Sequence, residues 1–173
     1  SQMAPGGGYF EFGGAYHTHG YARTLNSMPG LMSAKGGNLD LLFGYLRPDW
    51  DYYMNLLTPV DSRWRARMIP GMANSPPSYT EHLLEAAGLF AERDPEFAAN
   101  LKWAWQENGS NDRGDGACGV NGIMDRPWLQ PKEPALGSRI YPGVGVVFRA
   151  HQGPDETYML FRSGFNWSHW YVD

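Results

Sequence analysis

Residues 78–109, SYTEHLLEAAGLFAERDPEFAANLKWAWQENG, carry the strongest structural pattern of the chain. Ser78 opens a capping-box pattern, and the apolar residues that follow it recur at helical spacing. Asp94 and Pro95 then have the order of an N-cap and a first-turn proline, and Gly109 is suited to follow a helix end. The stretch therefore predicts two amphipathic helices that form an antiparallel hairpin.

The sequence before this hairpin alternates between apolar helical patterns and proline-rich breaks. Residues 16–28 predict a helix that ends at Pro29. Residues 38–57 have a mostly apolar pattern, which we expect to break into two helices at Pro48. Residues 59–77 contain four prolines and no clear period, so they predict a loop.

The sequence after the hairpin changes from helical to β character near residue 135. Residues 144–149 and 157–162 are rich in β-branched and aromatic side chains, and residues between them have turn chemistry, which predicts a β-hairpin. We therefore divide the chain into residues 1–134 and 135–173. A lone hairpin is not a stable domain, so we expect this chain to be an internal segment of a longer protein.

The composition is that of a globular protein and excludes several partners. Charged residues make up 18% and the formal net charge is -4, so the chain is not suited to a nucleic-acid backbone. No basic run predicts a membrane surface, and no apolar stretch is long enough to span a bilayer. Cys118 is the single cysteine and cannot form an internal disulfide. The high aromatic content suits either sugar binding or a large core.

Two segments contain side chains suited to proton transfer. In the first, Glu11 precedes Tyr16 and His17 at the expected start of a helix. His17 and His19 would share one face of a strand as half of a metal site, but on a helix they diverge, which favours packing. The second segment follows the last expected strand and places His169 among aromatic residues. Taken alone, such a histidine is more often packed than catalytic.

Together the two segments resemble the heparinase II/III-type polysaccharide lyases. In that family a Glu precedes a Tyr-His pair by five residues, the spacing of Glu11 and Tyr16. The stretch 141–149 resembles the aromatic-Pro-x-x-Gly strand that opens the β-sandwich of the family and leads to an Arg. Residues 162–164, Arg-Ser-Gly, and the segment that begins at His169 resemble the strand end and the His-x-His-x-Asp motif that follow.

The resemblance implies an α+β multidomain fold. Residues 1–134 would form the C-terminal part of an incomplete (α/α) toroid, and residues 135–173 would form the first strands of an antiparallel β-sandwich. It also implies a secreted or periplasmic lyase that acts on an acidic polysaccharide, with the remainder of the parent polypeptide completing both domains. No signal peptide is visible in the sequence, so the location follows from the resemblance alone.

The implied reaction is β-elimination beside a uronic acid. The enzyme must neutralise the carboxylate, remove the C5 proton and protonate the departing oxygen. The resemblance gives Tyr16 the role of acid, or of both acid and base, which requires its pKa to fall from about 10 toward neutrality. It gives His169 the role of base or of a supporting residue. No motif in the chain identifies the residue that neutralises the substrate carboxylate.

Five further side chains are candidates for substrate contact, each with a structural alternative. They are His17, Arg23, Arg162, Trp167 and Trp170. In the structural alternative, His17 packs and Arg23 is a solvated helix charge. The second arginine either meets substrate acid groups or braces its loop. The two tryptophans either stack on sugar rings or fill the core.

The resemblance also has a departure and leaves alternatives open. Tyr171 stands where some family members have a second histidine that helps to bind a structural zinc, and a phenol is a poor zinc ligand, so we expect no metal or other cofactor. A uronyl C5-epimerase on the same scaffold and a non-catalytic carbohydrate-binding or structural module remain alternatives. A glycoside hydrolase would need a placed carboxylate pair, and no motif places one among Glu11, Glu81, Glu107 and Asp112.

Overall fold

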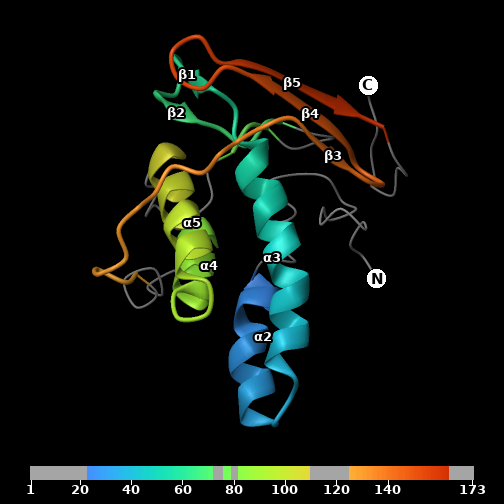
Figure 1. The fold of residues 1–173 in the computed structure, drawn as a ribbon, viewed down its shortest axis with the longest axis vertical. Coiled ribbons are helices and arrows are strands. Elements are labelled where there is room, and N and C mark those ends of the chain that lie inside the picture. Colours follow the sequence, from blue (N-terminus) through green and yellow to red (C-terminus); the bar gives the residue numbers. More distant parts are fainter. Residues whose placement is uncertain (1–22, 72–75, 79–81, 110–124, 164–173) are drawn as a thin grey trace.

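The computed structural model describes residues 23–71, 76–78, 82–109 and 125–163. Within these ranges the fold is a mixture of α-helices and small antiparallel sheets (Figure 1). The helices are α2 (Arg23–Ala34), α3 (Leu39–Leu56), α4 (His82–Phe90) and α5 (Pro95–Glu107). The strands are β1 (Val60–Asp61), β2 (Ala66–Arg67), β3 (Arg139–Tyr141), β4 (Gly145–Ala150) and β5 (Thr157–Arg162).

Helix α3 is the longest element and runs through Pro48, so the expected break at that proline is wrong. Asn38 caps the helix, since its Oδ1 accepts from the backbone N–H of Leu41 at 3.0 Å. A buried stripe continues at helical spacing on both sides of the proline, from Leu46 to Trp50, and this packing holds the helix in one piece. Helix α2 likewise contains Pro29 in its interior, against expectation.

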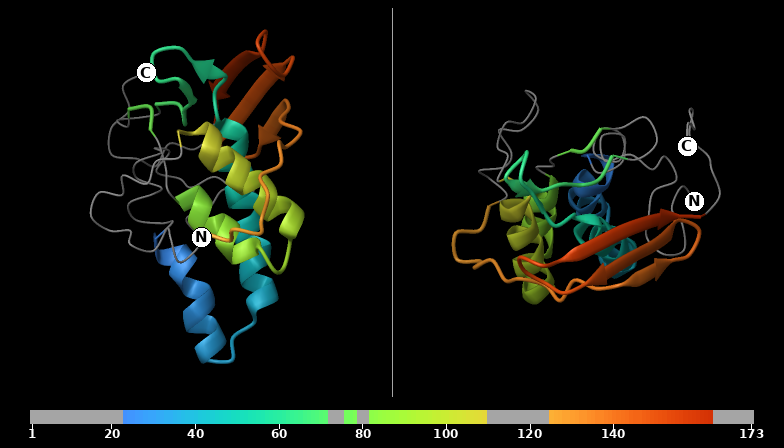
Figure 2. Two further views of the ribbon diagram at one scale, coloured as in Figure 1. Left: turned by 90° about the vertical axis from the view of Figure 1, so that its left-hand side faces the viewer. Right: turned by 90° about the horizontal axis from the view of Figure 1, so that it is seen from above.

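The expected helical hairpin is present as α4 and α5, which lie side by side in Figures 1 and 2. Asp94 caps α5 by accepting from the N–H of Phe97 at 3.1 Å, with Pro95 in the first turn, as the sequence predicts. Ser78, the expected N-cap, pairs through its backbone with Ile69 in an isolated β-bridge, and within the described residues its Oγ has no hydrogen-bond partner. Glu81, the other member of the expected capping box, lies outside the described residues.

The larger sheet has the strand order β3-β4-β5, and its strands cross the end of α3 (Figures 1 and 2). The β4–β5 pair confirms the expected hairpin, with Val147 opposite Leu160. The stretch 141–149, expected to be one strand, is instead the end of β3, a tight turn and β4. In that turn the N–H of Val144 donates to the carbonyl of Tyr141 at 2.9 Å, and Gly143 has a φ of 83°.

The two faces of this sheet have different surroundings. The inner face places Tyr141 and Val147 in the hydrophobic core, against the helices. The outer face exposes apolar side chains from all three strands, and the register places them next to one another: Ile140, Phe148, Met159 and Phe161. In the described ranges, no helix combines the length and the apolar character needed to cross a membrane.

Candidate functional site

Most residues that the sequence nominates for the site lie outside the described residues. These are Tyr16, His17, Trp167, His169 and Trp170, together with Tyr171. Arg23 is the first residue of α2, and its side chain is not among those described. Arg162 is the last residue of β5, opposite Gly145, and is half-buried. The candidate catalytic pair therefore stays a prediction, and Arg162 alone can be placed by its surroundings.

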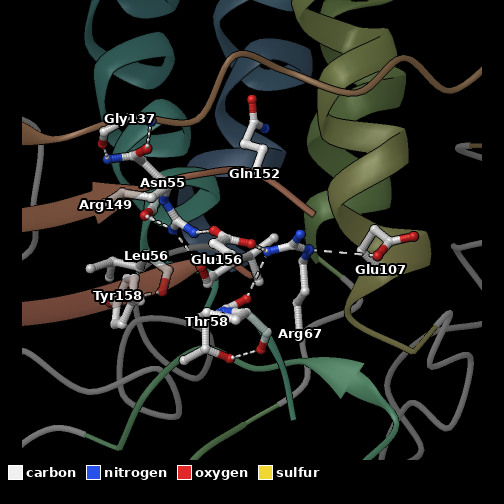
Figure 3. Close-up of polar contacts among 12 residues, drawn as sticks. Asn55, Leu56, Thr58, Arg67, Glu107, Gly137, Arg149, Gln152, Glu156 and Tyr158 are labelled. Atoms are coloured by element: carbon white, nitrogen blue, oxygen red, sulfur yellow. Dashed lines mark hydrogen bonds and ion pairs between the residues drawn. The ribbon is translucent and has the colours of Figure 1, made fainter. Parts of the chain in front are cut away.

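The best-defined polar site of the described part lies where α3 ends against the sheet (Figure 3). The last carbonyls of a helix lack partners within the helix and need donors from elsewhere. Here Arg149 of β4 donates from Nη2 to the carbonyls of Asn55 and Leu57, at 3.1 and 2.6 Å. The Tyr158 hydroxyl of β5 donates to the carbonyl of Leu56 at 3.1 Å. The sheet thus caps the C-terminal end of α3.

A buried carboxylate joins two arginines beside this helix end. Glu156, in the β4–β5 turn, forms ion pairs with Arg149 and with Arg67 of β2, the latter at 2.7 Å. The side chains of these three residues are only 1%, 2% and 6% exposed, in that order. Arg67 also donates to the carbonyl of Thr58 at 3.1 Å and lies 3.6 Å from the half-exposed Glu107. The cluster is therefore neutral, with two cations and two anions, and has no surplus charge for an ionic ligand.

Three tyrosines line the buried side of the same junction. Burial raises the pKa of Tyr52, Tyr141 and Tyr158 above the usual value, to about 12 for Tyr141. The positive charge of Arg162 acts in the opposite direction, toward a lower pKa of Tyr52, but burial outweighs it. These phenols stay protonated at neutral pH. Tyr158 donates its hydrogen bond to the Leu56 carbonyl, Tyr52 and Tyr141 pack against each other, and none of the three has the lowered pKa that a tyrosine base needs.

A second buried polar pair lies at the start of α4. His82 Nδ1 and Glu85 Oε2 are 2.6 Å apart, and the His82 side chain is 1% exposed. A carboxylate that accepts from Nδ1 fixes the tautomer and the ring orientation of an imidazole. The same geometry occurs in catalytic dyads and in packed cores, and the burial of His82 favours the second role.

Metal binding has no support in the described part of the chain, where no three histidine, cysteine or acidic side chains cluster in a way that could hold an ion. His17 and His19 are not described. Glu107, one of the carboxylates considered for a hydrolase, is paired with Arg67 at the junction. Glu11, Glu81 and Asp112 are not described, so the structure does not test a catalytic carboxylate pair.

Sequence reasoning missed both buried polar clusters. The His82-x-x-Glu85 spacing on an expected helix was a usable signal, because residues three apart share a helix face. Glu156 had no such signal, since a glutamate beside Gly153 and Pro154 reads as a solvated turn charge. Its burial depends on arginines that are 7 and 89 residues away along the chain.

Comparison of the chain with protein-family models, with curated proteins and with solved structures finds no match. The likeness to the lyases therefore depends on the motifs alone.

Proposed function

We propose that this chain is part of a secreted or periplasmic polysaccharide lyase that cleaves uronic-acid-containing polysaccharides by β-elimination. Tyr16 acts as acid, or as acid and base, and His169 acts as base or supports it. The observation that carries the proposal is the order of three motifs along the chain, which begin at Glu11, Tyr141 and Arg162.

Two features of the described residues support the β part of this proposal. The family motif has a strand that ends in Arg-Ser-Gly, and β5 ends at Arg162, directly before Ser163. The outer face of the sheet exposes neighbouring apolar side chains such as Phe148 and Phe161. The first sheet of a β-sandwich presents such a face to its second sheet. We propose the toroid and sandwich assignment on the same grounds.

The buried tyrosines narrow the choice of proton donor. Tyr52, Tyr141 and Tyr158 have raised pKa values and lie in the junction, so they are unsuited to exchange protons with a polysaccharide. The proposal therefore keeps Tyr16 as the reacting phenol.

The decisive experiment measures β-elimination by the full parent protein and by its Tyr16→Phe variant. The substrates are alginate, heparin, chondroitin sulfate and ulvan, and the readout is the near-ultraviolet absorbance of the new double bond. Tyr45→Phe is the matched control, because Tyr45 is exposed on α3 and has no role in the proposal. Loss of the product with Tyr16→Phe and its retention with Tyr45→Phe are expected.

Other outcomes assign other functions. Full activity of Tyr16→Phe removes Tyr16 from the mechanism. Exchange of the C5 proton without shortening of the polymer identifies an epimerase. If none of the four polymers reacts, the result favours a non-catalytic carbohydrate-binding or structural module.

A further inference from the structure

Helix α2 and the first half of α3 extend past the end of the α4–α5 pair, away from the sheet (Figures 1 and 2). This α2–α3 tip, residues 23–43, contributes little to the core. Of the nine buried residues of α3, only Leu42 precedes Gly44. Among the described side chains of α2, only Pro29 is buried. A segment with so few buried side chains has a lower local stability than the core from which it extends.

The turn of α3 that joins the tip to the core is the weakest part of the helix. Pro48 has no N–H, so the carbonyl of Gly44 loses its partner within the helix. Within the described part of the chain, a Cβ added to Gly44 would meet nothing within 4 Å. Close packing therefore does not require a glycine at this position. Glycine and proline one turn apart are instead typical of a helix that bends.

An arginine fastens the tip to the turn between α4 and α5. Arg93, in that turn, forms an ion pair with Asp40 in the first turn of α3, at 2.5 Å, and both side chains are exposed, to 40% and 87%. The same guanidinium lies 4.7 Å from the centroid of the Phe43 ring. The Phe43 ring also meets Phe90 of α4 edge to face, with the centroids 5.1 Å apart. One exposed side chain thus makes two of the contacts that hold the tip in place.

The core side of the same turn is fixed separately. Arg47 forms an ion pair with Asp94 at 2.9 Å, and its guanidinium lies 4.5 Å from the centroid of the Phe97 ring. Asp94 is the N-cap of α5, so this contact ties α3 to the helical hairpin. The weak turn therefore has a fixed side and a lightly held side.

We infer that α3 bends at a hinge, residues 44–48, and that Arg93 is the latch that closes the α2–α3 tip onto the α4–α5 turn. When the ion pair with Asp40 opens, the tip turns away as a unit and α2 stays helical, because the hinge residues absorb the change in backbone angles. Opening separates Phe43 from Phe90 and uncovers apolar surface between the tip and the core. The ratio of the closed to the open arrangement depends on an exposed contact that salt screens.

The test is amide hydrogen exchange of the full chain, measured residue by residue by NMR. In a helix each N–H bonds to the carbonyl four residues earlier, so the N–H groups of Leu46 and Arg47 reach back past Gly44 and report opening of the hinge. The N–H of Met32 reports α2, and that of Leu101 reports the core of α5.

Arg93→Gln removes the latch without a change in the tip itself. We expect it to raise the exchange rates of Leu46 and Arg47 about tenfold, the combined effect of one exposed ion pair and one cation–π contact. Met32 and Leu101 should exchange as in the parent. The matched control is Glu96→Gln, which breaks an exposed ion pair that does not involve α3 and should leave all four rates unchanged.

Salt and a second glycine separate a latched hinge from general loosening. A tenfold rise in salt concentration should raise the hinge rates of the parent about threefold and leave those of Arg93→Gln unchanged, because that variant has no ion pair to screen. Gly44→Ala should slow hinge exchange about fivefold, since alanine stiffens the turn. Gly30→Ala, at an equally open position inside α2, should leave hinge exchange unchanged.

The inference is overturned if Arg93→Gln exchanges at Leu46 and Arg47 as the parent does, or if Glu96→Gln has an equal effect. It is also overturned if Met32 exchange rises together with that of Leu46, or if Gly30→Ala slows hinge exchange as much as Gly44→Ala does. Either result means that α2 unfolds locally and that the tip does not move as a unit. Hinge rates in the parent that do not depend on salt exclude the ion pair as the latch.

Discussion

Replacement of Glu156 by glutamine tests whether the buried carboxylate holds the helical part and the sheet together. The substitution keeps the volume and one acceptor oxygen but removes the negative charge between Arg67 and Arg149. All three side chains are almost fully buried, so water does not screen the remaining positive charges. Breaking a buried pair by removing one partner lowers stability by about 3–5 kcal/mol.

We expect Glu156→Gln to lower the free energy of unfolding by about 3 kcal/mol, the lower end of this range, because the amide oxygen still accepts a hydrogen bond. For a chain of this length that loss lowers the melting temperature by about 6–12 °C. Urea unfolding followed by tryptophan fluorescence measures it, since Trp50 is buried in the core. Urea is preferred to guanidinium chloride, whose ions screen charges.

The matched control is Glu96→Gln, which breaks an exposed ion pair between α5 and Lys132. We expect it to change the free energy of unfolding by less than about 0.5 kcal/mol. The double variant Arg67→Met/Glu156→Gln should lose less than the sum of its single variants, because removal of Arg67 relieves the uncompensated charge. A Glu156→Gln variant as stable as the parent, or strictly additive losses, would refute the proposed coupling.

Three further predictions concern single residues. Gly145→Ala should lower the free energy of unfolding by about 2 kcal/mol in urea, because the new Cβ would lie 2.3 Å from the backbone carbonyl of Phe161, whereas Gly137→Ala, with open space around it, should be neutral. The pKa of Asp61 is lowered from 3.8 to about 2, chiefly by its hydrogen bond with Arg63. The stability that this pair adds should therefore persist at neutral pH and disappear as the pH falls through about 2. NMR titration of the Asp61 carboxyl group checks this, and a midpoint that stays low in Arg63→Ala would contradict it. His82→Leu should destabilise the fold by about 2 kcal/mol, because Glu85 loses its Nδ1 donor, and a variant as stable as the parent would show that this contact contributes little.

The sequence predicts the local elements of this fold better than their interruptions. The α4–α5 pair and the β4–β5 hairpin follow from periodicity and turn chemistry, because both depend on contacts close in sequence. Pro48 was expected to end a helix, since proline removes one backbone hydrogen bond. The buried stripe from Leu46 to Trp50 crosses it at helical spacing, so tertiary packing outweighs the local preference. The Pro142-Gly143 pair, by contrast, is a turn signal that the sequence already shows within the stretch 141–149, which was expected to be one strand.

The polar junction shows why a site cannot be derived from motifs alone. Arg149 is the last residue of the stretch 141–149, which resembles a strand of the lyase family. In the fold it donates to the carbonyls of Asn55 and Leu57 and pairs with Glu156, so its charge is already used to cap α3. The same donors that end the helix fix the direction of β4 and β5, and therefore the position of Arg162 at the end of β5, opposite Gly145. A change at Glu156 should thus reach Arg162 through the backbone of β5, and activity lost with Glu156→Gln would be a loss of positioning and not of chemistry.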